Sequence, residues 1–264
     1  MAKLKMQIIF NRNLLDKYKS AAQRARVLSE QWVHSQSYCP NCGQNSLEKY
    51  ESGRPVADFY CAKCREEFEL KSKKTIIGRR VVDGAFSTMI DRLNSSTNPN
   101  LFLLSYDLID LIVNDFLIIP KHFFTPEIIE QRRALSPSAQ RAGWIGCNIL
   151  LDGIPLSGRI YLVKNRQIEP IETVLSIWKK TLFLRDETDL KTRGWLLDIM
   201  GCIDKLGYRE FSLDQIYSFE FELEKKHPDN RHIKEKIRQQ LQVLRDTGYL
   251  EFVERGHYRL IDQK

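Results

Sequence analysis

The chain has 264 residues, of which 42% are hydrophobic and 28% are charged, and its formal net charge is +7. This composition is typical of an ordinary globular protein, and the length allows two domains that each bury a core. Residues 1–185 hold 27 basic and 18 acidic side chains, whereas residues 186–264 hold 14 and 16. The basic balance of the larger part favours a partner with a phosphate backbone.

Hydropathy argues against export and against membrane insertion. The N-terminus, MAKLKMQIIF, has only a short apolar run before Asn11, so it predicts no secretory signal. The most apolar window, residues 101–119, is interrupted by Asp107, Asp110 and Asp115 and cannot span a bilayer. We therefore expect a cytoplasmic protein with no membrane partner, whose six cysteines stay reduced and favour metal binding over disulfides.

Hydrophobic periodicity predicts a mixed α/β domain over residues 1–185. Its first element is a helix over residues 12–33, where apolar side chains recur every three or four positions. The elements expected after it are strands at 54–60 and 66–72, a helix at 83–93, strands at 101–106, 113–119, 145–151 and 159–163, and a helix at 170–183.

Four cysteines follow the first helix as two CxxC pairs separated by eighteen residues. The pairs are Cys39 with Cys42 and Cys61 with Cys64. Each such pair supplies two thiolates from a tight turn, and zinc prefers four ligands in a tetrahedron. The spacing predicts a structural zinc site over residues 39–64, in preference to four unrelated buried cysteines or a redox motif. Four protein ligands would leave no open position for water.

A second pattern, formed by Asp58, Glu69 and Lys71, occupies the same stretch. Glu69 and Lys71 are two residues apart on an expected strand, so they share a face. Asp58, Glu69 and the backbone carbonyl of Leu70 make a hard oxygen site suited to Mg²⁺. Lys71 is expected to hold the attacking water and stabilise transition-state charge, so the pattern predicts phosphodiester hydrolysis, although solvated strand edges show similar spacings. Glu30, on the first helix, could add an acidic ligand but is more simply an exposed residue.

A polar, charged run at residues 185–192 predicts a domain boundary. Beyond it, helices are expected at 194–206, 212–225 and 230–247, followed by an alternating hairpin over 249–260. Three helices and a hairpin predict a winged helix over residues 186–264, a relative of the helix-turn-helix. Trp195 and Cys202 in this domain, and Cys147 in the first, lie in apolar surroundings and are expected in the core.

The third of these helices has one apolar face and one polar face. The candidate DNA-contacting side chains on the polar face are Arg231, Arg238, Gln239 and Gln242. Arginine can read guanine in the major groove, and all four can reach phosphates. A solvated helix face is the alternative, because the domain as a whole carries a charge of −2 and winged helices also bind proteins.

Five stretches of the chain closely resemble the DpnI-type restriction endonucleases: SYCPNCG, RPVADFYC, EEFELKSKK, RAGWIGCNI and HIKEKIRQQLQVLRD. They occur in the same order and at similar spacing over nearly the whole chain. The resemblance implies a PD-(D/E)XK nuclease domain with a zinc-binding ribbon insertion, followed by a winged helix. It also implies a type II, methyl-directed enzyme that uses Mg²⁺ and cleaves double-stranded DNA at GATC containing N6-methyladenine. Carried over by motif, the catalytic residues fall on Asp58, Glu69 and Lys71.

Recognition of an N6-methyl group in the major groove requires an apolar surface. Trp144 is the candidate, because neighbouring glycines allow close approach of the backbone. Arg132, Arg133 and Arg141 precede it and can hold phosphates. A position in the core is the alternative for this tryptophan.

Two other functions are compatible with the sequence. One is a DNA-binding regulator made of a zinc ribbon and a winged helix, and the other is a nuclease of the same fold with another target site. The Asp58, Glu69 and Lys71 trio argues against the regulator, because a protein that only binds DNA needs no such site. The expected cofactors are structural Zn²⁺ and catalytic Mg²⁺, and the expected partner is double-stranded DNA with methylated adenine rather than a small-molecule substrate.

Overall fold

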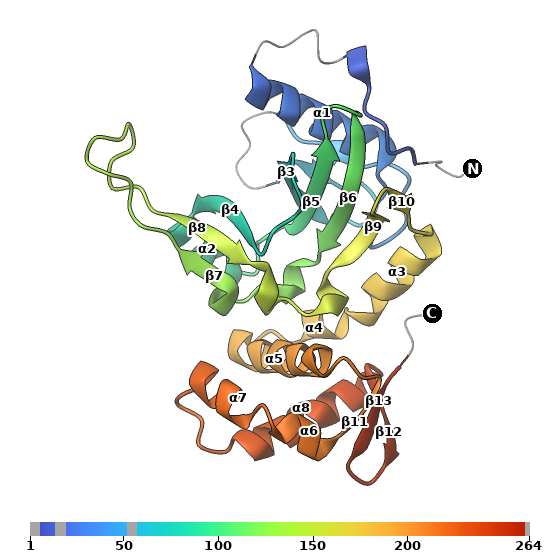
Figure 1. Ribbon diagram of the computed structural model, residues 1–264, viewed down its shortest axis with the longest axis vertical. Helices are drawn as coiled ribbons and strands as arrows, with labels where there is room; N and C mark the ends of the chain where they lie inside the picture. The colour runs from blue at the N-terminus through green and yellow to red at the C-terminus, as the bar shows by residue number, and fades with distance from the viewer. Residues whose placement is uncertain (1–5, 14–19, 52–56, 262–264) are drawn as a thin grey trace.

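The computed structural model describes residues 6–13, 20–51 and 57–261. Its largest sheet has seven strands in the order β1-β2-β3-β5-β6-β9-β10 (Figure 1). Their bounds are Glu48–Lys49 (β1), Phe59–Tyr60 (β2), Glu67–Lys73 (β3), Asn100–Asp107 (β5), Ile112–Ile119 (β6), Ile160–Lys164 (β9) and Gln167–Ile168 (β10). Only β3 and β5 pair in parallel, and the other neighbours are antiparallel.

Two smaller sheets have three strands each. The first, β4-β8-β7, packs beside the large sheet, and the second, β11-β13-β12, belongs to the C-terminal part of the chain. Their bounds are Arg80–Ala85 (β4), Ile129–Gln131 (β7), Gly146–Leu150 (β8), Glu210–Ser212 (β11), Leu250–Glu254 (β12) and His257–Leu260 (β13).

Eight α-helices and four short 3₁₀ helices occur in the described residues. The α-helices are Ala21–Gln36 (α1), Phe86–Asn94 (α2), Ile171–Lys180 (α3), Phe183–Asp186 (α4), Leu190–Leu206 (α5), Leu213–Tyr217 (α6), Glu220–Lys226 (α7) and Ile233–Asp246 (α8). The 3₁₀ helices are Lys121–Phe123 (η2), Pro126–Ile128 (η3), Leu151–Gly153 (η4) and Leu156–Gly158 (η5). None of the helices in this part of the chain is both long and apolar enough to cross a membrane.

The seven-stranded sheet is buried on both faces because its central strands are apolar throughout. On β5, Phe102 and Leu104 face a core that also contains Trp32 of α1 and Trp178 of α3. Leu101 and Leu103 face the opposite core, which includes side chains of the β4-β8-β7 sheet. This alternation is the period of two that a strand imposes. The face that carries Glu69 and Lys71 is therefore the one turned toward β4, because β3 pairs in register with β5.

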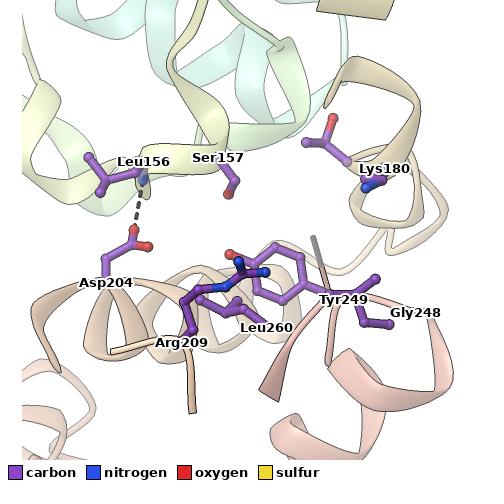
Figure 2. Close-up of a pocket in the computed structure, with 10 residues that line it drawn as sticks. Leu156, Ser157, Lys180, Asp204, Arg209, Gly248, Tyr249 and Leu260 are labelled. Atoms are coloured by element: carbon purple, nitrogen blue, oxygen red, sulfur yellow. Dashed lines mark hydrogen bonds between the residues drawn. The ribbon is translucent and has the colours of Figure 1, made fainter. Parts of the chain in front are cut away.

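The C-terminal helices and sheet form the predicted winged helix, which lies below the first domain in Figure 1. A single hydrophobic cluster runs through both domains and includes Leu184, Trp195 and Cys202. At the junction, Asp204 of α5 accepts a hydrogen bond of 2.7 Å from the backbone N–H of Leu156 (Figure 2). Tyr249 lines a cavity of about 360 Å³ beside this contact.

Most of the expected strands and helices are present in the described residues, and the differences are as follows. The expected helix at 83–93 begins only at Phe86, because Asp83 lies on β4, which pairs with a strand more than 60 residues later. The expected helix at 212–225 is divided into α6 and α7. Parts of the first helix (14–19) and of the strand at 54–60 (54–56) lie outside the described residues. The strand β4 was not predicted. The short strands β1, β7, β10 and β11 were not predicted either, because they have little periodicity of their own.

Candidate active site

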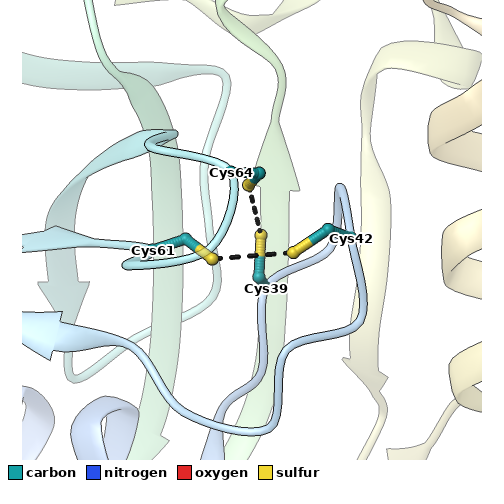
Figure 3. A group of neighbouring side chains, drawn as sticks. All are labelled: Cys39, Cys42, Cys61 and Cys64. Atoms are coloured by element: carbon teal, nitrogen blue, oxygen red, sulfur yellow. Dashed lines mark hydrogen bonds between the residues drawn. The ribbon is translucent and has the colours of Figure 1, made fainter.

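The four paired cysteines converge on one point (Figure 3). The Sγ atoms of Cys39 and Cys64 are 3.5 Å apart, those of Cys42 and Cys61 are 3.6 Å apart, and all four lie within 4.8 Å of one another. Zinc bound at about 2.3 Å to four tetrahedral thiolates requires sulfur separations of about 3.8 Å. The cluster could therefore hold a zinc ion, and four thiolates are the ligand set typical of structural zinc sites.

Both cysteine turns have the same backbone geometry. Gly43 donates its N–H to the carbonyl of Cys39 at 2.8 Å, and Arg65 donates to the carbonyl of Cys61 at 2.8 Å. Gly43 has a φ of 73° and Arg65 a φ of 61°, so each turn closes through a residue in the left-handed region. Glycine adopts this conformation without strain, which explains its position directly after Cys42.

Asp58 and the strand β3 bring the expected catalytic residues together. Asp58 precedes β2, and its backbone N–H donates to the carbonyl of Phe68 at 2.9 Å. Its Oδ2 accepts a hydrogen bond of 2.7 Å from the N–H of Leu70, which places the carboxylate beside the middle of β3. Lys71 Nζ lies 2.6 Å from Glu69 Oε1.

A third carboxylate, Asp83, contacts the same lysine and was missed in the sequence. Its Oδ1 lies 2.7 Å from Nζ of Lys71. Asp83 was expected on a helix, whereas it lies on β4, where its carboxylate contacts Lys71 of β3. No motif or spacing in the sequence near Asp83 indicates this contact, because the contact depends on the packing of two separate sheets.

Glu30 is buried, so the simpler prediction of an exposed helix residue was wrong. Its carboxylate is 2.6 Å from Nε of Arg26 and also pairs with Lys49 of β1. The hydroxyl of Ser29 donates to that of Ser72 at 3.1 Å, which ties α1 to the strand that carries Lys71. The charge of Glu30 contributes to raising the pKa of Asp58, so the two carboxylates share one electrostatic environment.

The site holds more negative than positive charge. Burial and the neighbouring Asp83 raise the pKa of Glu69 to about 7, although Lys71 opposes this rise. Burial also raises the pKa of Asp58, against the lowering effect of the hydrogen bond from Leu70. Burial alone would lower the pKa of Lys71, but Glu69 and Asp83 outweigh it and raise that pKa, so the lysine stays protonated. The three carboxylates do not converge as closely as the cysteines, and a divalent cation bound by oxygen ligands and waters would balance them.

Glu69→Gln is expected to stabilise the fold at pH 8 in the absence of divalent cations. A raised carboxyl pKa means that the contribution of Glu69 to stability is present below pH 4.5 and is lost as the pH rises through about 7. Because the side chain is paired and partly exposed, we expect a gain of about 1–2 kcal/mol in the free energy of unfolding.

Urea unfolding at pH 8 and at pH 5.5 would measure this gain, with Glu48→Gln on the exposed edge strand β1 as the control. The gain should shrink at pH 5.5, because wild-type Glu69 is then largely protonated. If Glu69→Gln is no more stable than wild type at pH 8, the site does not carry the destabilising excess of negative charge that we infer.

Comparison with known families gives two matches that together span most of the chain. Residues 6–187 match the DpnI family, described as the Dam-replacing family, and residues 191–260 match the Dam-replacing HTH domain. The chain belongs to the DpnI family. Membership implies a nuclease that acts on DNA, and the HTH domain implies that the C-terminal part binds DNA. The family therefore favours the nuclease over the regulator.

The expected DNA contacts of the first domain lie on a long arm, residues 132–145, between β7 and β8 (Figure 1). Arg132, Arg133 and Arg141 are exposed on it. Trp144 is half-buried, and the guanidinium of Arg141 lies 4.6 Å from the centre of its ring. The ring also lies against Gly146, where an added Cβ would approach it to 2.7 Å.

Three of the expected contacts of the winged helix, Arg238, Gln239 and Gln242, lie on the exposed face of α8, whereas Arg231 lies two residues before the helix, which begins at Ile233. Arg231, Arg238, Gln239 and Gln242 are all exposed, whereas the stripe that includes Ile237 and Leu241 is buried. Figure 1 shows α8 in the lower domain, apart from β3 and β4. The structure therefore does not bring these side chains to the carboxylates.

Proposed function

We propose that this DpnI-family chain is a Mg²⁺-dependent type II endonuclease that cleaves double-stranded DNA at GATC containing N6-methyladenine. Residues 1–185 would form a PD-(D/E)XK nuclease domain and residues 186–264 the winged-helix DNA-binding domain. The observation that carries the proposal is the Lys71 ammonium held between Glu69 and Asp83, with Asp58 beside the same strand. A structural zinc or DNA binding alone would not require this buried charged cluster.

The residues fit the chemistry of phosphodiester hydrolysis. Asp58, Glu69 and the carbonyl of Leu70 would hold Mg²⁺, which neutralises charge on the phosphate and lowers the pKa of a bound water. Lys71 is protonated, so its part is to donate hydrogen bonds to the attacking water and to the phosphate oxygen that gains charge. Because β3 is fixed in the middle of the sheet, these groups are held in place before DNA arrives.

The position of the arm supports methyl recognition by the first domain. Cys147 of β8 pairs with Asp83 on one side and with Gln131 of β7 on the other, so the arm begins beside the proposed active site. Its arginines would hold phosphates, and Trp144 would offer an apolar surface to the N6-methyl group. Since Arg141 covers part of the Trp144 ring, a bound base would use the uncovered surface or displace the guanidinium.

The winged helix would supply further contacts through α8. Its exposed arginines and glutamines have the chemistry to reach phosphates and base edges in the major groove. Local charge supports this role, because residues 225–259 carry nine basic and five acidic side chains within a domain of net charge −2.

Digestion of one GATC-bearing plasmid with Mg²⁺, in adenine-methylated and unmethylated forms, tests the proposal. We expect cleavage of the methylated plasmid only, and no cleavage of either form with EDTA. Equal cleavage of both forms would keep the nuclease and refute the methyl specificity. Binding of both plasmids without cleavage would refute the nuclease and favour the DNA-binding regulator.

A further inference from the structure

Asp83 contacts the proposed catalytic lysine from a different sheet. The Nζ atom of Lys71 is 2.7 Å from Asp83 Oδ1 and 2.6 Å from Glu69 Oε1, so the ammonium lies between two carboxylates. The Asp83 side chain is 5% exposed, compared with 21% for Glu69 and 29% for Lys71. Of the two partners of the lysine, Asp83 is the more deeply buried.

The backbone around Asp83 fixes the direction of its carboxylate. Its Oδ1 also accepts a hydrogen bond of 2.7 Å from the N–H of Gly84. The pairing of β4 with β8 shifts register between Asp83 and Ala85, which marks a β-bulge. Bulges of this kind re-aim side chains beside active sites. The other oxygen, Oδ2, is buried and has no hydrogen-bond partner within the described part of the chain.

We propose that Asp83 is a positioning residue that holds the ammonium of Lys71 in place for DNA cleavage. The inference rests on the proposed nuclease function. The carboxylate of Glu69 would bind both the metal and Lys71. The metal would draw on the negative charge of Glu69, which weakens the contact of Glu69 with Lys71. Asp83 has no other cationic partner than Lys71 among the ion pairs of the described residues. It would therefore keep the lysine aimed at the reacting phosphate.

Asp83→Ala and Asp83→Asn test this role, with Glu130→Gln as the matched control. Glu130 lies on β7 of the same small sheet and pairs with Arg80, at 3.2 Å, rather than with Lys71. We expect the single-turnover cleavage rate of Asp83→Ala to fall about 100-fold, the typical effect of a misplaced catalytic group. The rate of Asp83→Asn should fall less, because the amide oxygen can still accept hydrogen bonds from Gly84 and Lys71. The control should cleave at the wild-type rate.

Two further measurements separate positioning from a structural role. The affinity for methylated DNA in Ca²⁺ and the Mg²⁺ concentration at half-maximal rate should both stay within about threefold of wild type. Adding Asp83→Ala to Lys71→Ala should lower the residual rate no further, because Asp83 acts only through the lysine.

A cleavage rate of Asp83→Ala equal to wild type would overturn the inference while leaving the nuclease intact. The inference would also be overturned if Asp83→Ala needed a Mg²⁺ concentration at least tenfold higher for its half-maximal rate and recovered the wild-type rate at high Mg²⁺. Asp83 would then be a metal ligand. If Asp83→Ala does not fold, Asp83→Asn is the deciding variant. A wild-type cleavage rate of Asp83→Asn, with wild-type dependence on Mg²⁺, would overturn the inference that the charge of Asp83 positions the lysine. Failure of the wild-type chain to cut any DNA would instead refute the proposed function.

Discussion

Lys71→Ala is expected to abolish DNA cleavage while leaving the fold and DNA binding in place. Among the ion pairs of the described residues, Lys71 is the only cation in contact with Glu69 and Asp83, and both carboxylates keep it protonated. Loss of a single preorganised donor to transition-state charge typically lowers a rate by about 10²–10³-fold, and loss of the water contact adds to this. We therefore expect a fall of about 10³-fold or more in the single-turnover rate on methylated DNA.

Asp58→Ala should have an effect of the same size, because it removes one of the two proposed metal-binding carboxylates. DNA affinity in Ca²⁺ and the melting temperature serve as the companion measurements. Lys164→Ala is the matched control, since Lys164 is an exposed lysine at the end of β9 in the same sheet. Cleavage by Lys71→Ala at a rate near that of Lys164→Ala would show that the catalytic assignment is wrong.

Cys61→Ser is expected to release zinc and to destabilise the first domain by several kcal/mol. Cys61 is fully buried, and a structural zinc ion contributes its binding free energy directly to folding. A serine hydroxyl is a poor replacement for a thiolate, and it would leave three thiolates close together without a fourth ligand. Zinc content by mass spectrometry and thermal unfolding measure the two effects.

The loss of zinc should also loosen the packing of α4, the short helix at the end of the first domain. Glu66, directly after the second cysteine turn, accepts the N–H of Cys61 through its backbone carbonyl at 2.9 Å. Its buried carboxylate accepts from Asn100 at 2.9 Å and pairs with Arg185 of α4 at 2.9 Å. We therefore expect faster hydrogen exchange in α4 in the Cys61→Ser protein than in wild type.

Cys202→Ser provides the control for this experiment, because Cys202 is equally a buried cysteine but lies in the winged helix, outside the cluster. It should keep one zinc ion per chain and unchanged exchange in α4. A stable Cys61→Ser protein that still cleaves DNA without zinc would show that the four thiolates are not a structural metal site.

Features that depend on local physical chemistry were predicted well. Two CxxC turns at a fixed spacing have few uses other than a metal site, and the structure brings all four sulfurs together. The in-phase spacing of Glu69 and Lys71 follows from the period of a strand, and the two side chains are in contact. The buried stripe of α8 likewise follows from helical periodicity, and Ile233, Ile237, Leu241 and Leu244 are all buried.

Features that depend on contacts between distant segments could not be predicted. Asp83 joins the lysine only because β8, more than 60 residues later, holds β4 against the large sheet. Glu30 is buried only because α1 packs against β3, and a helical pattern cannot show what covers a polar position. The separation of α8 from the carboxylates likewise follows from how the two domains pack (Figure 1). Periodicity and motif spacing act over a few residues, whereas these arrangements arise from sheet pairing and core packing across the whole chain.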